Sequence, residues 1–409
     1  MRKKVLAVVL GAAMVASMSS MVMAADAEET VTPNEEYSFE VVVKSYQSSY
    51  WQAAVKGIQD EADAIGVKVN CTGPNSESDI ADQVNMLNNA ISQNPDGIGL
   101  AACDQDSVLD SLTKAKEAGI PVVCFDSGVP NAPEGSVYST IATDNYGAGA
   151  VAAENLYPAV KDKIKEMVDA GTVVQVGEVN QDCTAESTSN RGLGFIDKFI
   201  ELATADGYTV AVTGNEFFVN NCSDAGDESS ANIVIQTAVP SQTTVELCAT
   251  EASKLLNVEN MVAIFGSNQV AAEGILTANQ NLSVLGSDPE TKILAAGFDA
   301  GSTIKAAVQD GTMYGAVTQS PLAMGKNTVD ILTKIANGEE VEDLPTQGYW
   351  YNVDNMEVDS IAPNLYDECE RNTQGGIHEI SKPYYKRRSF GFSFLYAGIV
   401  VKMYKIKSI

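Results

Sequence analysis

Short apolar runs and longer amphipathic stretches alternate along the chain from residue 37 onward. Continuous apolar runs are typical of strands buried on both faces, and apolar residues three or four apart are typical of helices. In the first series we predict strands at 39–45, 66–71, 96–102 and 120–126. We predict helices between them at 50–65, 79–93 and 106–118. This alternation predicts a parallel sheet with helices on both faces.

A second series of the same kind begins near residue 145. Its strands are predicted at 171–178, 208–214, 261–267, 292–300, 313–319 and 348–356. Its helices are predicted at 146–170, 190–205, 241–256, 269–280, 301–310 and 321–337. Because 409 residues are too many for one ordinary core, the two series predict two α/β lobes with a cleft between them. Ligands of such sheets bind beyond the carboxyl ends of the strands.

Both ends of the chain depart from this pattern. Residues 1–24 begin with basic residues, continue as an apolar run and end in small residues, which is typical of a secretory signal. We expect cleavage after Ala24, with Ala27 as the alternative, followed by a linker over 25–36. A membrane anchor is disfavoured because serines interrupt the short apolar run. We therefore expect an exported protein, either periplasmic or extracellular and at the cell surface.

Residues 372–409 form an atypical basic and aromatic tail, with seven Lys or Arg and one acidic residue. Its apolar stretch at 389–401 is too short to span a bilayer comfortably. We favour a poorly folded appendage over a segment that lies at a membrane interface. No cysteine precedes Cys71, so the usual lipid-modified cysteine after a signal is absent.

The net charge of −28 is concentrated between these two basic ends. So acidic a surface repels nucleic acid and anionic lipid, which argues against binding to DNA. A basic helix-turn-helix is also missing from the sequence, so the chain is not expected to be a DNA-binding repressor.

Seven cysteines occur, without a C-x-x-C pair and without zinc-like spacing. We expect Cys103 and Cys124 to be buried thiols, whereas Cys183 and Cys222 are the best candidates for a bridge. The acidic stretch at 224–228 lacks the spacing of a calcium loop and is expected to be solvated. We expect no metal and no cofactor.

The sequence offers little for catalysis. Its single histidine, His378, lies in the tail, so the core lacks a Ser-His-Asp or Cys-His constellation. The stretch GAGAVA at 147–152 fits a dinucleotide fingerprint, but the next strand end, at Glu178, follows after about 30 residues instead of about 20. Close packing of helices on these small residues is favoured. Strand-end carboxylates such as Asp104 leave an exported glycosidase as an alternative.

A polar and aromatic set remains at the predicted strand ends and helix starts. It comprises Tyr50, Trp51, Asp126, Arg191, Asn268, Asp299 and Gln319. Aromatic faces and paired hydrogen-bonding groups fit a sugar, which presents apolar C–H faces and a ring of hydroxyls. The alternatives are structural: helix caps for the aspartates, core packing for the aromatics, and an ion pair between Arg191 and a cleft aspartate.

Seven fragments follow one another along the chain: SSYWQAAVKGIQDEADAIGVKV, GIPVVCFDSG, TIATDNYGAGAVAAENL, SNRGLGF, FGSNQVAAEG, AAGFDAG and GAVTQSPLAMG. Together they resemble the periplasmic-binding-protein superfamily of the ribose and galactose type, which has the type I fold. The resemblance covers about 39–365 and implies two doubly wound parallel-sheet lobes joined by a three-strand hinge. It implies an N-terminal lobe at 37–143 plus about 320–345, and a C-terminal lobe at 144–319 plus about 346–368.

The resemblance also implies roles for the polar and aromatic set. In that superfamily, aromatics after the first strand stack on the sugar, and Tyr50 and Trp51 match them. The remaining matches to its ligand residues are Asp126, Arg191, Asn268, Asp299 and Gln319. The departures from ribose binders are Ser48-Ser49, Ala101-Ala102 and Ser127. They argue against ribose and favour another pentose, a hexose or a cyclitol.

The function implied is that of a monomeric solute receptor, which closes on a monosaccharide-like ligand and delivers it to the permease of an ABC importer. The resemblance implies neither enzymatic activity nor a nucleic-acid partner. A receptor that presents a sugar or an autoinducer to a membrane sensor is the alternative, because the two differ only in their partner surface.

Overall fold

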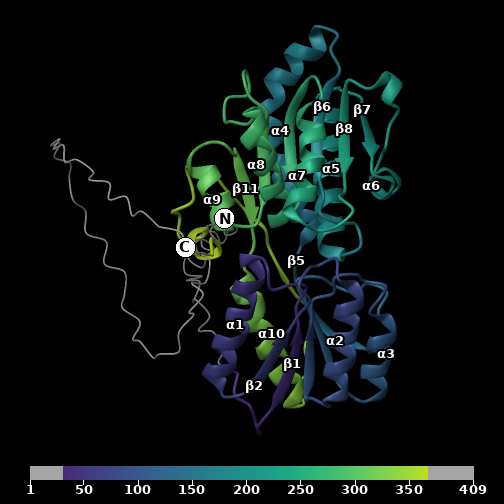
Figure 1. Cartoon of the computed structure of the whole chain (residues 1–409), viewed down its shortest axis with the longest axis vertical. Coiled ribbons are helices and arrows are strands. Elements are labelled where there is room, and N and C mark those ends of the chain that lie inside the picture. Colours follow the sequence, from purple (N-terminus) through teal and green to yellow (C-terminus); the bar gives the residue numbers. More distant parts are fainter. Residues whose placement is uncertain (1–30, 367–409) are drawn as a thin grey trace, which may run out of the picture. The chain divides into compact units, whose positions relative to one another are not determined.

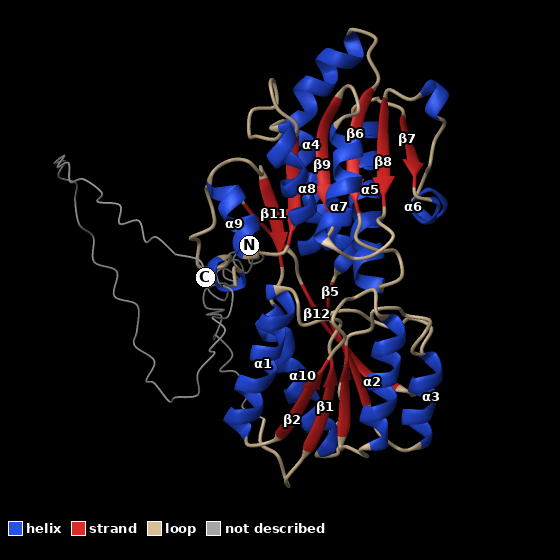
Figure 2. Cartoon of the chain, viewed as in Figure 1, coloured by secondary structure: helices blue, strands red, loops and turns tan. Residues whose placement is uncertain are grey.

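The computed structural model describes residues 31–366, which contain two α/β lobes (Figure 1 and Figure 2). The predicted signal peptide and basic tail lie outside these residues. The first lobe contains a six-stranded sheet in which all neighbouring strands are parallel. In spatial order its strands are β12 (Leu344–Thr346), β5 (Val137–Thr143), β4 (Val122–Phe125), β3 (Gly97–Leu100), β1 (Ser38–Val42) and β2 (Lys68–Thr72).

Helices cover both faces of this sheet, as its fully apolar central strands require. One face carries α1 (Ser49–Ile65) and α10 (Pro321–Ala336), and the other carries α2 (Ile80–Ser92) and α3 (Leu109–Glu117) (Figure 2). Each face has its own core: Phe39 and Ile58 are buried on the first, and Leu87 and Leu112 on the second. Because all pairs are parallel, the carboxyl ends of the strands lie at one edge of the sheet.

The second lobe contains a seven-stranded sheet that is parallel except for its first strand. In spatial order its strands are β13 (Tyr349–Tyr351), β11 (Gly315–Thr318), β10 (Leu294–Phe298), β9 (Met261–Gly266), β6 (Val174–Val179), β8 (Ile233–Ala238) and β7 (Val210–Gly214). Its helices are α4 (Asn145–Asp169), α5 (Glu186–Ala205), α6 (Glu216–Asn221), α7 (Val245–Leu256), α8 (Gln269–Leu282) and α9 (Ser302–Gln309). Within residues 31–366, no helix combines the length and the apolar character needed to cross a bilayer.

The chain passes three times between the lobes, after β5, after β11 and after β12. β5 belongs to the first sheet, and the helix that follows it, α4, packs in the second lobe against α5. The return after β11 leads into α10, which packs on α1. The predicted fold class, two doubly wound parallel-sheet lobes, is confirmed.

Two long strands, β5 and β8, lie where no element was predicted. In β5 the buried positions include Ser139 and Thr143, so the strand has no continuous apolar run to mark it. In β8 only Ile233, Val234 and Ile235 form such a run before Gln236 interrupts it. Each strand is stabilised by parallel pairing with its neighbouring strands. The periodicity of the local sequence gives no information on this pairing.

The small residues at 147–152 lie inside α4, where they allow a close approach of α5. A Cβ at Gly149 would clash with the backbone oxygen of Arg191, and a Cβ at Gly194 would clash with that of Tyr146. The stretch is therefore a helix-packing surface, and the dinucleotide alternative is not supported. The contact also sets the position of Arg191 relative to the start of α4.

Replacing Gly149 with Ala is expected to lower the free energy of unfolding by about 1–3 kcal/mol, because the new methyl group forces the two helices apart. Urea unfolding of the variant measures this change. Gly128→Ala is the matched control, since the nearest atom to its added Cβ is 3.6 Å away. Equal stability of the two variants would contradict the close helix contact.

All six cysteines in the described residues are free. Cys103 and Cys124 are buried, as predicted, and burial raises the pKa of the Cys124 thiol to about 12. Cys183 and Cys222, the best candidates for a bridge, are not joined, and the bridge hypothesis is wrong. Cys222 lies at the end of α6, where its thiol contacts the backbone oxygen of Val219.

Candidate functional site

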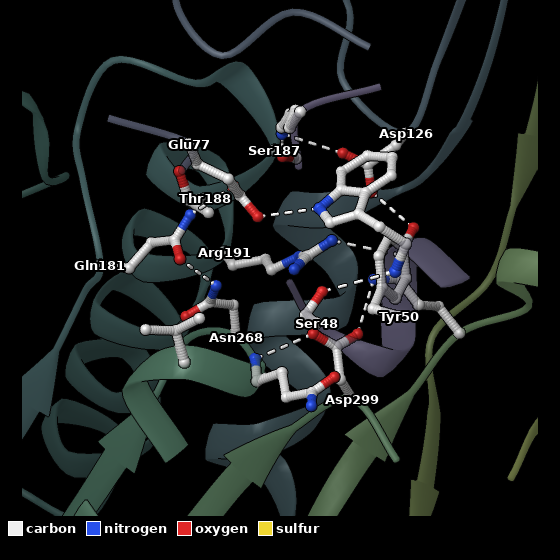
Figure 3. Close-up of a pocket in the computed structure, with 15 residues that line it drawn as sticks. Ser48, Tyr50, Glu77, Asp126, Gln181, Ser187, Thr188, Arg191, Asn268 and Asp299 are labelled. Carbon is white, nitrogen blue, oxygen red and sulfur yellow. Dashed lines mark hydrogen bonds and ion pairs between the residues drawn. The ribbon is translucent and has the colours of Figure 1, made fainter. Parts of the chain in front are cut away.

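A pocket lies between the lobes, at the carboxyl edges of both sheets (Figure 3). All seven residues predicted from the sequence line it: Tyr50, Trp51, Asp126, Arg191, Asn268, Asp299 and Gln319. The other lining residues are Lys44, Ser48, Glu77, Gln181, Ser187, Thr188, Gln269 and Val270. Its free space is about 20 Å³, room for about one water molecule, because polar side chains of the two lobes bond to one another across it. The structure thus brings the predicted set together around one polar pocket.

Two aspartates occupy corresponding places in the two lobes. Asp126 follows the last residue of β4, and Asp299 follows the last residue of β10; each comes directly after a phenylalanine. Both have left-handed backbone conformations, with φ of 63° and 73°. Asp adopts this region more readily than most residues, but the conformation still needs support from its surroundings. The turn directs each carboxylate into the pocket, and neither residue is the cap of a helix.

The carboxylate of Asp126 is shared by two buried donors. Tyr50 donates its hydroxyl to Oδ1 at 2.5 Å, and the Lys44 ammonium lies 2.9 Å from Oδ2. The side chains of Lys44 and Asp126 are only 2% and 5% exposed. Lys44 also donates to the Ser187 hydroxyl at 3.0 Å and lies 5.9 Å from the centre of the Trp51 ring. This cluster joins the first lobe to the start of α5 in the second.

Both members of this ion pair are held in their charged forms. Burial alone would lower the pKa of Lys44, but the nearby Asp126 and Glu77 carboxylates raise it. Burial alone would raise the pKa of Asp126, but Lys44, Arg191 and the Tyr50 hydroxyl lower it. Although Lys44 contacts Ser187, a protonated ammonium cannot act as the base of a Ser–Lys pair. The geometry therefore gives no activated nucleophile at this position.

Arg191 extends from α5 into the middle of the pocket (Figure 3). Its Nε donates to Asn145 Oδ1 at 2.8 Å, and its Nη2 donates to Gln319 Oε1 at 3.2 Å. The guanidinium stacks on the Phe298 ring at 3.9 Å. Together with the Ser267 carbonyl, 3.5 Å from Nη1, these partners take three of the five N–H groups, so the guanidinium keeps donor capacity for a further group in the pocket. The hypothesis of an ion pair with a cleft aspartate is not supported.

Asp299 is held by backbone and side-chain amides. Gln319 donates Nε2 to Oδ1 at 2.8 Å, and the backbone N–H of Gln269 donates to Oδ2 at 2.9 Å. Burial raises the pKa of Asp299 above its usual value, although Arg191 and these amides partly oppose the rise. Gln319 therefore connects Asp299 with Arg191, and each of these side chains fixes the direction of the next.

A second chain of hydrogen bonds crosses the pocket from one lobe to the other. Trp51 Nε1 donates to Glu77 at 2.8 Å, and Gln181 Nε2 donates to the same carboxylate at 2.7 Å. Asn268 then donates to Gln181 Oε1 at 2.5 Å. Asn268 also caps α8, since its side chain accepts from the N–H of Ala271. Asn268 therefore caps a helix and lines the pocket at the same time.

Sequence reasoning missed Lys44, Glu77 and Gln181. A lysine directly after the apolar run of β1 is a signal that could have been used, because an unpaired charge at that place would be costly. Gln181 follows β6 in the same way. Glu77 lies in a loop before α2, among other polar residues, and no local pattern distinguishes it.

Behind the pocket, Glu178 of β6 is fully buried, and neither of its carboxylate oxygens has a hydrogen-bond partner within the described residues. Burial raises its pKa to about 8. The carboxyl group lies against Gly192 of α5, where a Cβ would clash with it. Glu178 is therefore a neutral acid at pH 7, packed beneath the helix that carries Arg191.

The proton on Glu178 makes stability depend on pH. Because folding raises the pKa from 4.5 to about 8, the folded state retains a proton that the unfolded chain releases. This contribution to stability is present below about pH 4.5 and is lost as pH rises through about 8. Glu178→Gln should flatten this part of the curve, measured by urea unfolding from pH 5 to 9, whereas the exposed control Glu259→Gln should not. An unchanged slope in Glu178→Gln would contradict the neutral acid.

Two α/β lobes with a polar pocket at the carboxyl edges of both sheets are the architecture of a binding protein for a small polar solute. The family model for the periplasmic binding protein domain matches residues 39–340. The chain belongs to the periplasmic binding protein family. Because this is a family of binding proteins, the prediction of a binding protein in place of an enzyme is confirmed.

Relatives and solved structures agree with this assignment. The ribose import binding protein of Escherichia coli is 24% identical over 341 residues, covering 83% of this chain and 95% of that protein. The D-allose-binding periplasmic protein of the same organism is 22% identical, covering 78% of this chain and 91% of that protein. An ABC transporter solute binding protein from Agrobacterium vitis with bound D-fucose is 27% identical, has a TM-score of 0.65 and covers 80% of this chain and 100% of that one.

Proposed function

We propose that this protein is the exported solute receptor of an ABC importer and that it captures a monosaccharide-like ligand between its lobes. The observation that carries the proposal is the pocket, in which three carboxylates, one guanidinium, one ammonium and two aromatic side chains surround a small space. This combination suits a ring of hydroxyls with apolar C–H faces. The same class is supported by the names of the relatives, which include a ribose import binding protein, a D-allose-binding periplasmic protein and a D-apiose import binding protein.

The proposed mechanism is closure of the two lobes on the ligand, with no bond broken. Asp126 and Tyr50 come from the first lobe, whereas Arg191, Asn268 and Asp299 come from the second, so a ligand that contacts both sets favours the closed arrangement. Direct bonds between the lobes add to this preference, among them Lys44–Ser187 and Glu77–Gln181. Closure hides the solute from water until the importer opens the lobes.

We further propose that the chain is exported. Several relatives carry the word periplasmic in their names, which supports export of this chain. We infer that residues 1–24 are the export signal, and that the hinge separates the predicted lobes at 37–143 plus 320–345 and at 144–319 plus 346–368. A bilayer-associated role for the tail is not part of the proposal.

The test is thermal unfolding of the chain without residues 1–24, against a panel of pentoses, hexoses and cyclitols. A ligand at one hundred times its Kd should add about 2.7 kcal/mol, which corresponds to a shift of several degrees. Asp126→Asn keeps a residue that tolerates the left-handed turn but removes the charge, and it should abolish the shift. If no member of the panel shifts the wild-type protein, the sugar-receptor function is wrong.

A further inference from the structure

The C-terminal clasp, residues 349–366, lies beyond residue 340, where the match to the family model ends. It consists of β13 and the chain that follows it to Tyr366, and it passes beside α9 (yellow-green in Figure 1). The clasp does not line the pocket. Its contacts nevertheless converge on the residues that do.

The peptide bond between Asp299 and Ala300 is held from both sides by phenols of the clasp. Tyr351 donates its hydroxyl to the Asp299 carbonyl oxygen at 2.7 Å. The N–H of Ala300 donates to the Tyr366 hydroxyl oxygen at 3.1 Å. Tyr351 is fully buried, and Tyr366 is 4% exposed. Both groups of one peptide unit are therefore paired with buried partners from a segment about 50 to 65 residues further along the chain.

This peptide needs such support because Asp299 has a φ of 73°. A non-glycine residue in the left-handed region is strained, and the surrounding contacts must hold it there. If the peptide rotated, the Asp299 carboxylate would leave Gln319 and turn away from the pocket. The corresponding turn at Asp126 has a different support, since its carboxylate is held by Lys44 and Tyr50.

The clasp also contacts the neighbours of Gln319 and one aromatic residue of the first lobe. The Thr318 hydroxyl donates to the Asn364 carbonyl oxygen at 2.7 Å, and Ser320 bonds to the Asn364 side chain. The Tyr366 ring meets the Tyr50 ring edge-on, with centroids 6.2 Å apart. The clasp therefore touches both lobes at the back of the pocket.

We propose that Tyr351 and Tyr366 are positioning residues of the ligand site, which act by holding the 299–300 peptide so that the Asp299 carboxylate faces the solute. The effect on affinity rests on the proposed function, whereas the effect on the peptide does not. Neither tyrosine lines the pocket, and both hold the peptide that follows Asp299. The Tyr366 hydroxyl also lies 3.5 Å from Oε1 of Gln269, a lining residue. The clasp, which lies beyond the matched family domain, would thus contribute to ligand binding.

The first experiment uses no ligand. Amide hydrogen exchange is followed in the wild type, in Tyr351→Phe/Tyr366→Phe and in the control Tyr138→Phe, an exposed tyrosine of β5. The double variant should exchange at least about tenfold faster at 297–302, because Ala300 loses its acceptor and Asp299 its donor. Strands β2 and β7 should be unaffected. Unchanged exchange at 297–302 would overturn the proposal, whether or not any sugar binds.

The second experiment measures Kd by calorimetry with D-ribose, D-allose, D-arabinose and D-fucose. The double variant should bind about tenfold more weakly than the wild type, and Tyr138→Phe should bind equally well. In an Asp299→Gly background, where the carboxylate is absent and the left-handed turn is tolerated, the same two changes should alter Kd less than about twofold. If the two tyrosine substitutions still weakened binding about tenfold in the Asp299→Gly protein, their effect would be a general structural one, and the positioning role would be wrong. If the wild type bound none of these sugars, the sugar-receptor function would be wrong. The hydrogen-exchange result would still test whether the clasp holds the 299–300 peptide.

Discussion

Replacing Lys44 with Met is expected to lower the free energy of unfolding by about 3–5 kcal/mol, because the Asp126 carboxylate is then buried without its cation. Both side chains are almost fully enclosed, so water cannot replace the lost partner. Asp126 retains only the Tyr50 hydroxyl at its Oδ1 and the more distant Arg191 charge. Urea unfolding at pH 7 measures the loss, and calorimetry with the best sugar of the panel should show weakened binding.

Two further variants make this expectation specific. Asp126→Asn introduced together with Lys44→Met should recover much of the lost stability, because no uncompensated charge remains. Lys56→Met is the matched control, since Lys56 forms an exposed ion pair with Asp60 within α1 and should change stability by less than about 1 kcal/mol. Equal effects of the two lysine substitutions would contradict the buried pair.

Replacing Arg191 with Met is expected to raise the Kd for the bound sugar by about one hundredfold or more. Hydrogen bonds from a charged donor contribute about 1.5–3 kcal/mol each, and the guanidinium has two or more N–H groups to offer a ligand in the pocket. Methionine keeps an apolar stem over the Phe298 ring, so the loss of donors dominates the result. Isothermal titration with the sugar that stabilises the wild-type protein gives the ratio of Kd values.

Arg191→Lys separates charge from geometry, since lysine keeps the charge but lacks the planar fork that binds Asn145 and Gln319 together. It should bind more weakly than the wild type and more tightly than Arg191→Met. Lys198→Met, on the outer side of the same helix, serves as the control and should leave Kd unchanged. A Kd for Arg191→Met within about threefold of the wild type would remove Arg191 from the proposed ligand set.

The sequence alone was sufficient for most of the fold because the strands are short, apolar and separated by helices of clear periodicity. Where a strand buries hydroxyl groups, as β5 does at Ser139 and Thr143, the apolar signal disappears and the element was missed. The seven site residues were predicted in the same way, from polar side chains directly after apolar runs or at helix starts. All of them line one pocket, and their role as ligand contacts stays a prediction.

Other parts of the site depend on pairing across the fold. Lys44 lies 2.9 Å from Asp126, and this contact identifies it as a member of the site. The two residues follow β1 and β4, strands that are not adjacent in the sheet. Glu77 belongs to the site because it accepts a hydrogen bond from Trp51, and Gln181 belongs to it because it donates one to Glu77. The apolar run before Lys44 indicates that its charge needs a partner, but nothing local indicates that the partner is Asp126, because the two residues are distant in sequence.

By itself, the sequence determined the two-lobed architecture, the absence of a catalytic histidine from the core and the character of the pocket. These follow from periodicity and from side-chain chemistry at strand ends, which are local properties. The tertiary structure decided the charge state of the pocket, through the enclosure of Lys44 with Asp126, and the support of Asp299 by Tyr351 and Tyr366. Both depend on burial and on contacts between distant segments, and these exist only once the chain has folded.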